Sequence, residues 1–177
     1  MTHVQAVTIQ KICVIAKRIN MGIKYINGDA TNPIGGGYKL IIHCCNDIGG
    51  WGRGFVLALS KKWKNPEQAY RNWHRDQPQS FKLGEIQRVP VEENISVVNM
   101  IGQHGVGFKD GKPPIRYEAI RECLKKVCSI CKMKNASVHA PKFGSDLAGG
   151  NWDIIEQIIN EELIEKDIEV IVYLFES

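Results

Sequence analysis

The chain has 177 residues, of which 44% are hydrophobic and 24% are charged. A chain of this length and composition forms one globular domain that buries a full hydrophobic core. No apolar run approaches the roughly 18 residues that a membrane-spanning helix needs. We therefore expect a cytoplasmic protein with no membrane segment.

Charge is unevenly distributed along the chain. The first 28 residues carry four basic residues and no acidic one, whereas residues 151–177 carry one basic and eight acidic residues. Residues 29–150 hold 18 basic and 11 acidic residues, so the middle of the chain favours anionic, phosphate-bearing ligands. The pI of about 8.7 does not by itself mark a nucleic-acid-binding domain.

The six cysteines show no arrangement typical of a secreted disulfide framework, so we expect reduced thiols. Cys128 and Cys131, together with Cys123, have part of the spacing of an iron–sulfur or zinc site. They also fall within a strong helical pattern of apolar residues, where cysteine serves as a small hydrophobic residue. We predict that they belong to the core, and we predict no metal and no cofactor.

The first 21 residues form an N-terminal extension of uncertain structure, and we place the domain at residues 22–177. A short strand at residues 4–9 fits the pattern, and the basic composition also fits a transit peptide, although arginine and serine are scarce. Residues 22–27 then alternate like a strand and lead into a turn-prone segment with Asp29 as its one carboxylate. That carboxylate is either a turn or helix cap or an acceptor for an exocyclic amine of a ligand.

A buried strand followed by two helices is predicted next. Residues 40–45 are apolar on both faces, which is typical of a central strand in a sheet covered by helices. Residues 55–63 form the first predicted helix, and the second begins at Pro66 behind a cap at Asn65. The aromatic residues of both helices most simply pack them against the rest of the domain.

The rest of the chain continues to alternate strands and helices. Further strands are predicted at residues 85–91, 95–101, 136–140 and 168–175, and further helices at residues 114–134 and behind a cap at Asn151. This order indicates an α/β domain with helices on both faces of a mixed sheet. Such sheets bind ligands at the carboxyl ends of their strands, where the connecting loops gather.

Two glycine-rich loops connect a predicted strand to a predicted helix. The first glycine loop, residues 47–54, contains four glycines, and the second, residues 141–150, contains three. Backbone N–H groups in such loops can approach an anion closely, and the following helix favours negative charge. Trp51 is unexpected in the first loop, because an exposed indole costs free energy unless another group packs over it. The alternative is a tight turn whose tryptophan packs on the fold.

These segments together resemble the macro domain, an ADP-ribose-binding module. The residues that carry the resemblance are the motifs GDAT, HCCNDIGGWGRGF, VVNMIGQ, PPIRYEAI and PKFGSDLAGGNW, and it extends from about Gly22 to Phe175. The chain looks most similar to bacterial macro domains, in the branch of the terminal ADP-ribose protein glycohydrolase and the fungal ADP-ribose 1''-phosphate phosphatase. The resemblance implies a three-layer α/β/α sandwich with a central mixed sheet.

The resemblance also implies which parts of the chain contact ADP-ribose. Asp29 would accept a hydrogen bond from adenine N6, and Tyr173 would lie against the adenine. Residues 144–147 would wrap the diphosphate with their backbone amides, while Asn46 and residues 49–54 would hold the distal ribose, with Trp51 covering it. The implied binding residues are Asp29, Ala30, Asn46, Gly50, Trp51, Gly52, Arg53, Gly54, Phe143, Gly144, Ser145, Asp146, Leu147 and Tyr173.

The catalytic residues of the glycohydrolase branch are not preserved here. At the position of that branch's lysine, this chain has Gln103, which cannot form a Schiff base, so the resemblance argues against a lysyl-adduct mechanism. Ala148 stands where that branch has an aspartate, and Asp146 lies two residues earlier. Phosphatase-like members carry a histidine that matches His43, although a strand histidine bonded to a backbone carbonyl is the simpler explanation.

Hydrolysis at the distal ribose would then proceed by water attack. Asn46 would position the ribose, while Asp47, His43 or Asp146 would orient or activate the water, and backbone amides would stabilise the developing charge. His104, in a third glycine-rich loop at residues 102–107, is a further candidate acid or base, but a solvated loop histidine explains it more simply.

Three functions remain in competition. We favour a monomeric hydrolase that acts on ADP-ribose derivatives or ADP-ribosylated substrates. The second is a reader that binds ADP-ribose without chemistry, which the missing lysine would allow. The third is binding of poly(A) or other RNA through the basic middle of the chain, which would depend steeply on salt.

Overall fold

The computed structural model describes residues 22–145 and 148–175, and it contains one mixed six-stranded sheet. The strand order is β1-β6-β5-β2-β4-β3, in which only β3 runs antiparallel to its neighbour. The strands are β1 (Lys24–Asn27), β2 (Tyr38–Asn46), β3 (Ile86–Glu92), β4 (Ile95–Gln103), β5 (Ala136–Pro141) and β6 (Val170–Leu174). The strand predicted at residues 4–9 lies outside the described residues.

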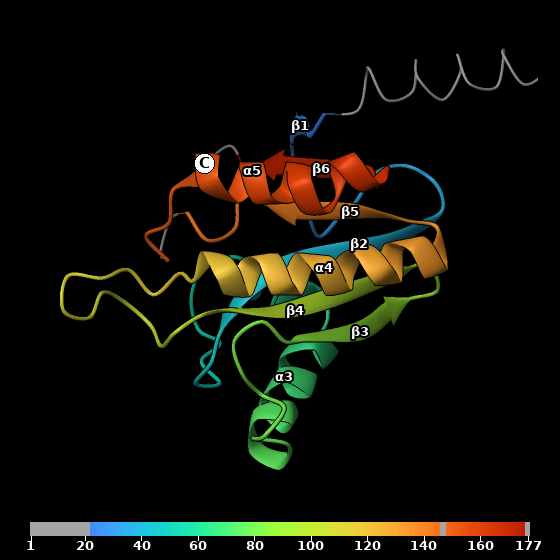
Figure 1. The fold of residues 1–177 in the computed structure, drawn as a ribbon. Helices are drawn as coiled ribbons and strands as arrows, with labels where there is room; N and C mark the ends of the chain where they lie inside the picture. Colours follow the sequence, from blue (N-terminus) through green and yellow to red (C-terminus); the bar gives the residue numbers. More distant parts are fainter. Residues whose placement is uncertain (1–21, 146–147, 176–177) are drawn as a thin grey trace, which may run out of the picture.

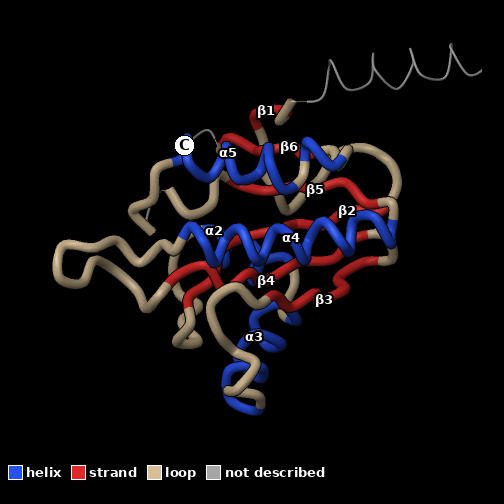
Figure 2. The backbone as a smooth tube through the Cα atoms, viewed as in Figure 1, coloured by secondary structure: helices blue, strands red, loops and turns tan. Residues whose placement is uncertain are grey.

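Helices cover both faces of the sheet, which confirms the predicted three-layer α/β/α sandwich (Figures 1 and 2). They are α2 (Phe55–Lys62), α3 (Asn65–Asp76), α4 (Tyr117–Lys134) and α5 (Trp152–Glu162), followed by a 3₁₀ turn, η1 (Ile164–Lys166). One core cluster joins α4 and α5 to the sheet, and a second joins α2 and α3 to its other face. No described helix has both the length and the apolar character that a membrane crossing needs.

Strand β2 shows why the sheet takes two helical layers. Its side chains alternate between the faces: Leu40 and Ile42 belong to the cluster under α4 and α5, whereas Ile41 and Cys45 belong to the cluster under α2 and α3. All four residues are at most 4% exposed. The strand therefore occupies the middle of the sheet, as its doubly apolar sequence predicts.

The three cysteines with metal-like spacing lie in the core, as predicted. Cys123, Cys128 and Cys131 belong to the core cluster under α4 and are at most 4% exposed. Burial raises the pKa of the Cys131 thiol to about 12. These cysteines act as small hydrophobic residues on the inner face of α4.

Two of the predicted helix starts are wrong, and two are confirmed, at Phe55 and behind Asn151. Asn65 is the first residue of α3 and not its cap, since its side chain donates to Pro90 O at 2.8 Å. Helix α4 begins at Tyr117 and not at Pro114, because Ile115 pairs with Gln103 in a β-bridge and keeps this segment extended. Asn151 does cap α5, because its Oδ1 accepts from Asp153 N at 2.8 Å.

The parallel strands bring the functional loops to one edge of the sheet. Strands β1, β6, β5, β2 and β4 all point the same way, so the loops that follow β1, β2, β4 and β5 start from the same edge. The loops after β2, β4 and β5 lie together at the left of the sheet in Figure 1. This is the edge where ligands bind to sheets of this type.

Candidate functional site

Two adjoining cavities open among these loops. The smaller one, about 180 Å³, lies between the first and second glycine loops and is lined by Gly54 and Gly144, among others. The larger one, about 670 Å³, lies between the first glycine loop and the third, and its lining includes Gly50 and Gly107. The residues that line both cavities are Cys44, Arg53, Val56 and Gln103. The two cavities therefore form a continuous site along the edge of the sheet.

The charged residues of both cavities are basic. Arg53 lines both cavities, Lys142 lines the smaller and Arg71 lines the larger. Among the described residues, no aspartate or glutamate lines either cavity. The site is therefore suited to an anionic ligand, which agrees with the basic bias of the middle of the chain.

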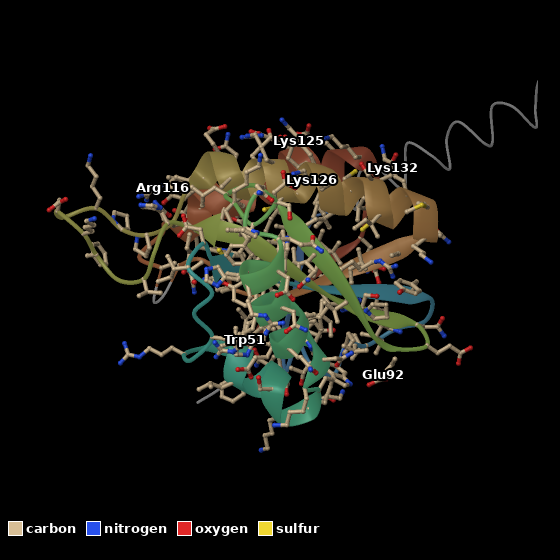
Figure 3. The ribbon with its side chains drawn as sticks, turned by 90° about the horizontal axis from the view of Figure 1, so that it is seen from below. Trp51, Glu92, Arg116, Lys125, Lys126 and Lys132 are labelled. Carbon is tan, nitrogen blue, oxygen red and sulfur yellow. The ribbon has the colours of Figure 1, made fainter. Side chains whose placement is uncertain are left out.

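Trp51 does not present an exposed indole; of the two alternatives for this residue, the structure shows the tryptophan that packs on the fold. The side chain is 6% exposed and lies beside the helical layer of α2 and α3 (Figure 3). Its Nε1 donates to Ser60 Oγ at 2.8 Å, and that hydroxyl donates to Glu67 Oε2 at 2.8 Å. Because the indole is buried and hydrogen-bonded in this way, we infer that Trp51 lines the larger cavity mainly through its backbone.

Arg71 completes a closed network around the first glycine loop. Its Nε donates to Glu67 Oε1 at 2.9 Å, and its two terminal nitrogens donate to Gly49 O at 3.3 Å and Trp51 O at 3.4 Å. The loop is thus fastened to α3 through its carbonyls. Side chains of α3 therefore support the first glycine loop, which glycine content alone could not indicate.

The side chain of Asn46 is also used to shape this loop. It is 7% exposed; its Oδ1 accepts from Gly50 N at 2.8 Å and Ile48 N at 3.2 Å, and its Nδ2 donates to Gly50 O at 2.8 Å. The Tyr70 hydroxyl donates to the Asn46 carbonyl. Asn46 lines the larger cavity, but its amide holds the loop, and its contact with a ribose stays a prediction.

His43 is buried at the back of the site. Its ring is 2% exposed, and its Nε2 lies 2.6 Å from Asn99 Oδ1. The Asn99 amide nitrogen donates to Gln87 Oε1 and Pro66 O, so the oxygen of Asn99 is left to accept from His43 Nε2–H. The partner is thus a side-chain oxygen rather than the backbone carbonyl we expected.

The environment of His43 keeps its imidazole neutral at pH 7. Burial lowers its pKa to about 4, although the hydrogen bond to Asn99 acts in the opposite direction. Its Nδ1 faces Cys45 Sγ at 3.7 Å, within the core. His43 lines the smaller cavity, but a neutral and almost fully buried ring is a poor acid or base, so its catalytic role remains a prediction.

Asp47 joins the first glycine loop to the third. Its Oδ2 lies 2.8 Å from His104 Nδ1, and its Oδ1 accepts from Gly105 N at 2.7 Å. The carboxylate is 16% exposed and the imidazole is 56% exposed. The pair thus lies at the surface, at the ends of the neighbouring strands β2 and β4.

The segment predicted to bind adenine follows β1. Asp29 accepts from Thr31 N and Thr31 Oγ1, both at 2.8 Å, so it organises its own turn. Ala30 and Tyr173 are 2% and 4% exposed and pack in one small cluster. The Tyr173 hydroxyl accepts from Ile34 N at 3.0 Å, which fastens this segment to β6. The structure brings Asp29, Ala30 and Tyr173 together, and their contact with adenine stays a prediction.

The second glycine loop follows β5 with a sharp turn. Gly144 has φ +77°, and its carbonyl accepts from Gly150 N at 2.9 Å. Phe143 is 5% exposed, and Ser145 Oγ donates to Lys142 O at 3.2 Å. Phe143 and Gly144 line the smaller cavity opposite Arg53 and Gly54, whereas Ser145 does not. The predicted site residues Asp146 and Leu147 lie outside the described residues.

Comparisons with known proteins decide the family. No family model matches the chain. A macrodomain protein from Streptomyces coelicolor is 49% identical, with a TM-score of 0.77 over 86% of this chain and 98% of that one. The chain belongs to the macrodomain family. A Bacteroides thetaiotaomicron protein of unknown function is 59% identical to this macrodomain, with a TM-score of 0.85 over 87% of this chain and 98% of the other.

More distant relatives extend the comparison. The mouse (Mus musculus) chromodomain-helicase-DNA-binding protein 1-like is 30% identical over an alignment of 164 residues that covers 86% of this chain. The match spans only 18% of that mouse protein, and 16% of its zebrafish (Danio rerio) counterpart. The Thermosipho africanus DarTG structure, in complex with ADP-ribose, shares the fold at 14% identity and a TM-score of 0.59, over 77% of this chain and 38% of that one.

Sequence reasoning missed several residues that line this macrodomain's site. Arg71, Lys142 and Val106 line the cavities without having been predicted. Glu67 and Arg71 stand four residues apart on a helix, which signals an ion pair on that helix. Nothing in that spacing shows that the guanidinium reaches the carbonyls of the first glycine loop.

Proposed function

We propose that this macrodomain binds ADP-ribose along the two adjoining cavities and hydrolyses a group from its distal ribose. The observation that carries the proposal is the continuous basic site between two glycine loops, with Arg53 shared by both cavities. A diphosphate carries two negative charges and accepts hydrogen bonds from backbone N–H groups, so this site matches its chemistry. The shared family and the DarTG complex with ADP-ribose support the same ligand.

The proposed pose runs from the turn at Asp29 to the larger cavity. The diphosphate lies in the smaller cavity, between the backbones of Gly54 and Gly144, with Arg53 neutralising its charge. The distal ribose lies in the larger cavity, against Gly50 and Trp51. The adenine lies over the cluster of Ala30 and Tyr173.

Asp29 has the acceptor capacity that adenine recognition requires. An ionised carboxylate offers about four lone-pair positions. Thr31 N and Thr31 Oγ1 use two of them at 2.8 Å, and the Asn32 amide approaches at 3.4 Å. The carboxylate can therefore accept the adenine N6 amine while the turn remains intact.

The chemistry at the distal end proceeds by attack of water. Gln103 lines both cavities and has no amine with which to form a covalent adduct. Asp47 is the described carboxylate next to the larger cavity, and Asp146 is kept as a second candidate from the sequence. Backbone amides of the glycine loops stabilise the negative charge that develops on the leaving oxygen.

A reader without catalytic activity is the second candidate function. It is favoured by the use of His43 and Asn46 side chains within the protein, where His43 bonds to Asn99 and Asn46 holds the first loop. A reader binds ADP-ribose as well as the hydrolase does but releases no product. The two functions therefore differ only in turnover.

Calorimetry with free ADP-ribose tests the shared premise. We expect saturable binding that weakens at least tenfold in Asp29→Asn, since one bond to a charged acceptor contributes about 1.5–3 kcal/mol. Glu93→Gln, in the exposed turn between β3 and β4, serves as the matched control and should bind like the wild type. An absence of heat with the wild type, or equal affinity in Asp29→Asn, would refute the assignment.

Mass spectrometry then separates the hydrolase from the reader. The wild type is incubated with ADP-ribose 1''-phosphate, O-acetyl-ADP-ribose, ADP-ribosylated protein and ADP-ribosylated nucleic acid. The hydrolase releases ADP-ribose from at least one of them over many turnovers. Binding without product at stoichiometric protein would establish the reader.

A further inference from the structure

The surface pair of His104 and Asp47 has the geometry of an acid–base dyad. Asp47 Oδ2 lies 2.8 Å from His104 Nδ1, and Asp47 Oδ1 accepts from the backbone of Gly105 at 2.7 Å. A solvated loop histidine would have no such partner. Here the loop backbone and the imidazole are both fastened to the same carboxylate.

This arrangement fixes which ring nitrogen is available. An ionised carboxylate only accepts hydrogen bonds, so the nitrogen that faces Asp47, Nδ1, carries the proton. In the neutral ring, Nε2 is then the acceptor. Since the His104 side chain is 56% exposed, its ring is accessible to water and to a ligand.

The dyad stands at the edge of the larger cavity. Asn46, which precedes Asp47, lines that cavity, and so do Gln103 and Val106 on either side of His104. Gly107 continues the same lining. The chain therefore lines the cavity on both sides of the histidine, whereas His104 and Asp47 themselves lie outside the lining, so we place the dyad at the rim of the cavity.

We infer that His104 is the acid–base residue of the proposed hydrolase and that Asp47 is its positioning residue. This inference rests on the proposed function. His43, the histidine indicated by the sequence, is 2% exposed and bonded to Asn99, whereas His104 has an accessible ring and a carboxylate behind it. The charged residues that line this cavity are Arg53 and Arg71, which are both positive. Among the described residues, Asp47 is the carboxylate in contact with His104, so it is the group that would stabilise an imidazolium there.

The proton transfers balance for an ester of the distal ribose. His104 Nε2 takes one proton from a water molecule as the water oxygen bonds to the ester carbonyl carbon. The tetrahedral intermediate collapses, the carbon–oxygen bond to the ribose breaks, and the ribose oxygen leaves with the electron pair. The imidazolium returns its proton to that oxygen, so the products are the free acid and ADP-ribose, and Asp47 stays ionised throughout.

The test uses the full chain with O-acetyl-ADP-ribose in single-turnover reactions and ADP-ribose in calorimetry. We expect His104→Ala to lower the rate by about 100-fold or more while the Kd for ADP-ribose stays within about twofold. Added imidazole should restore part of the rate in His104→Ala, and the pH profile of the rate should differ between that variant and the wild type. A purely structural role would produce neither effect.

Two further variants make the outcome specific. Asp47→Asn should lower the rate at least about tenfold without rescue by imidazole, because an amide does not hold the ring in the same tautomer. Lys112→Ala removes a positive charge further along the same connection between β4 and α4 and should react at the wild-type rate.

Several results would overturn the inference. They are a His104→Ala rate within about threefold of the wild type, an equal loss in Lys112→Ala, or no rescue by imidazole together with weakened ADP-ribose binding. Wild-type protein that binds ADP-ribose but leaves the ester intact would reject the dyad and preserve the binding claim. Wild-type protein that does not bind ADP-ribose would reject the proposed function itself.

Discussion

Because two histidines are buried in the folded protein, we predict that its free energy of unfolding falls in mild acid. His43 is 2% exposed and His139 is fully buried, and burial lowers the pKa of each to about 4 from the ordinary value of 6.5. The positive charge of Lys39 also lowers the pKa of His139. Both rings are enclosed by hydrogen-bond partners, Asn99 for His43 and Ser137 and Tyr173 for His139.

The direction of the effect follows from where the protons bind. Between pH 6.5 and pH 4 the unfolded chain binds a proton on each histidine and the folded protein does not. The free energy of unfolding therefore falls as the pH decreases through this window. From the folded and unfolded pKa values, each histidine lowers the free energy of unfolding at pH 5 by about 2 kcal/mol. The pair therefore lowers it by about 4 kcal/mol relative to its value at pH 7 or above.

Urea unfolding followed by tryptophan fluorescence measures this loss directly. The expected decrease is a large part of the roughly 5–15 kcal/mol by which a domain is stable, so the urea midpoint should fall markedly between pH 7 and pH 5. His43→Gln keeps an N–H donor for Asn99 and should lose only about half as much stability over the same interval. A wild-type stability that does not change between pH 7 and pH 5, or an equal decrease in His43→Gln, would refute the reasoning.

Three substitutions around the cavities give further predictions. Arg53→Ala should weaken ADP-ribose binding at least tenfold, because a charge-assisted contact contributes about 1.5–3 kcal/mol, and it should reduce the salt dependence of binding. Calorimetry at two ionic strengths measures both effects, and an unchanged salt dependence would contradict this prediction. Gly150→Ala should lower the melting temperature by several degrees, since a Cβ there would overlap the backbone oxygen of Gly144. Gly52→Ala is the control, because its Cβ meets open space and should leave the melting temperature unchanged. Equal shifts in the two variants would contradict this prediction. Tyr70→Phe removes the hydroxyl that holds the start of the first glycine loop and should cost about 1–3 kcal/mol in urea unfolding, and a smaller loss than about 0.5 kcal/mol would show that this hydroxyl is dispensable.

The fold could be predicted from the sequence because its signals are local and strong. The doubly apolar run at residues 40–45 has one suitable place, the middle of a sheet covered on both faces, and β2 lies there. Asn151 caps α5 as its side chain predicts. The sequence-based prediction of a helix start failed where a contact with another segment decides the local conformation. At Pro114, the pairing of Ile115 with Gln103 delays the start of α4.

The side-chain details of the site could not be predicted, because they depend on partners far apart in the chain. The indole of Trp51 is buried by residues of α2 and α3, and no feature of the glycine loop itself indicates those contacts. His43 and His104 look alike in sequence, yet one is enclosed beside Asn99 and the other faces solvent beside Asp47. The sequence identifies which residues gather at the edge of the sheet, and the structure decides which of them remain accessible.

The most direct test of the central claim is an NMR titration of the ¹⁵N-labelled protein with ADP-ribose. The account predicts saturable shifts in the backbone amides of Ala30, of residues 50–54 and of residues 144–145, with little change along the outer face of α4 near Lys125 and Lys132 (Figure 3). Shifts confined to α4, or no saturable shift at all, would contradict it.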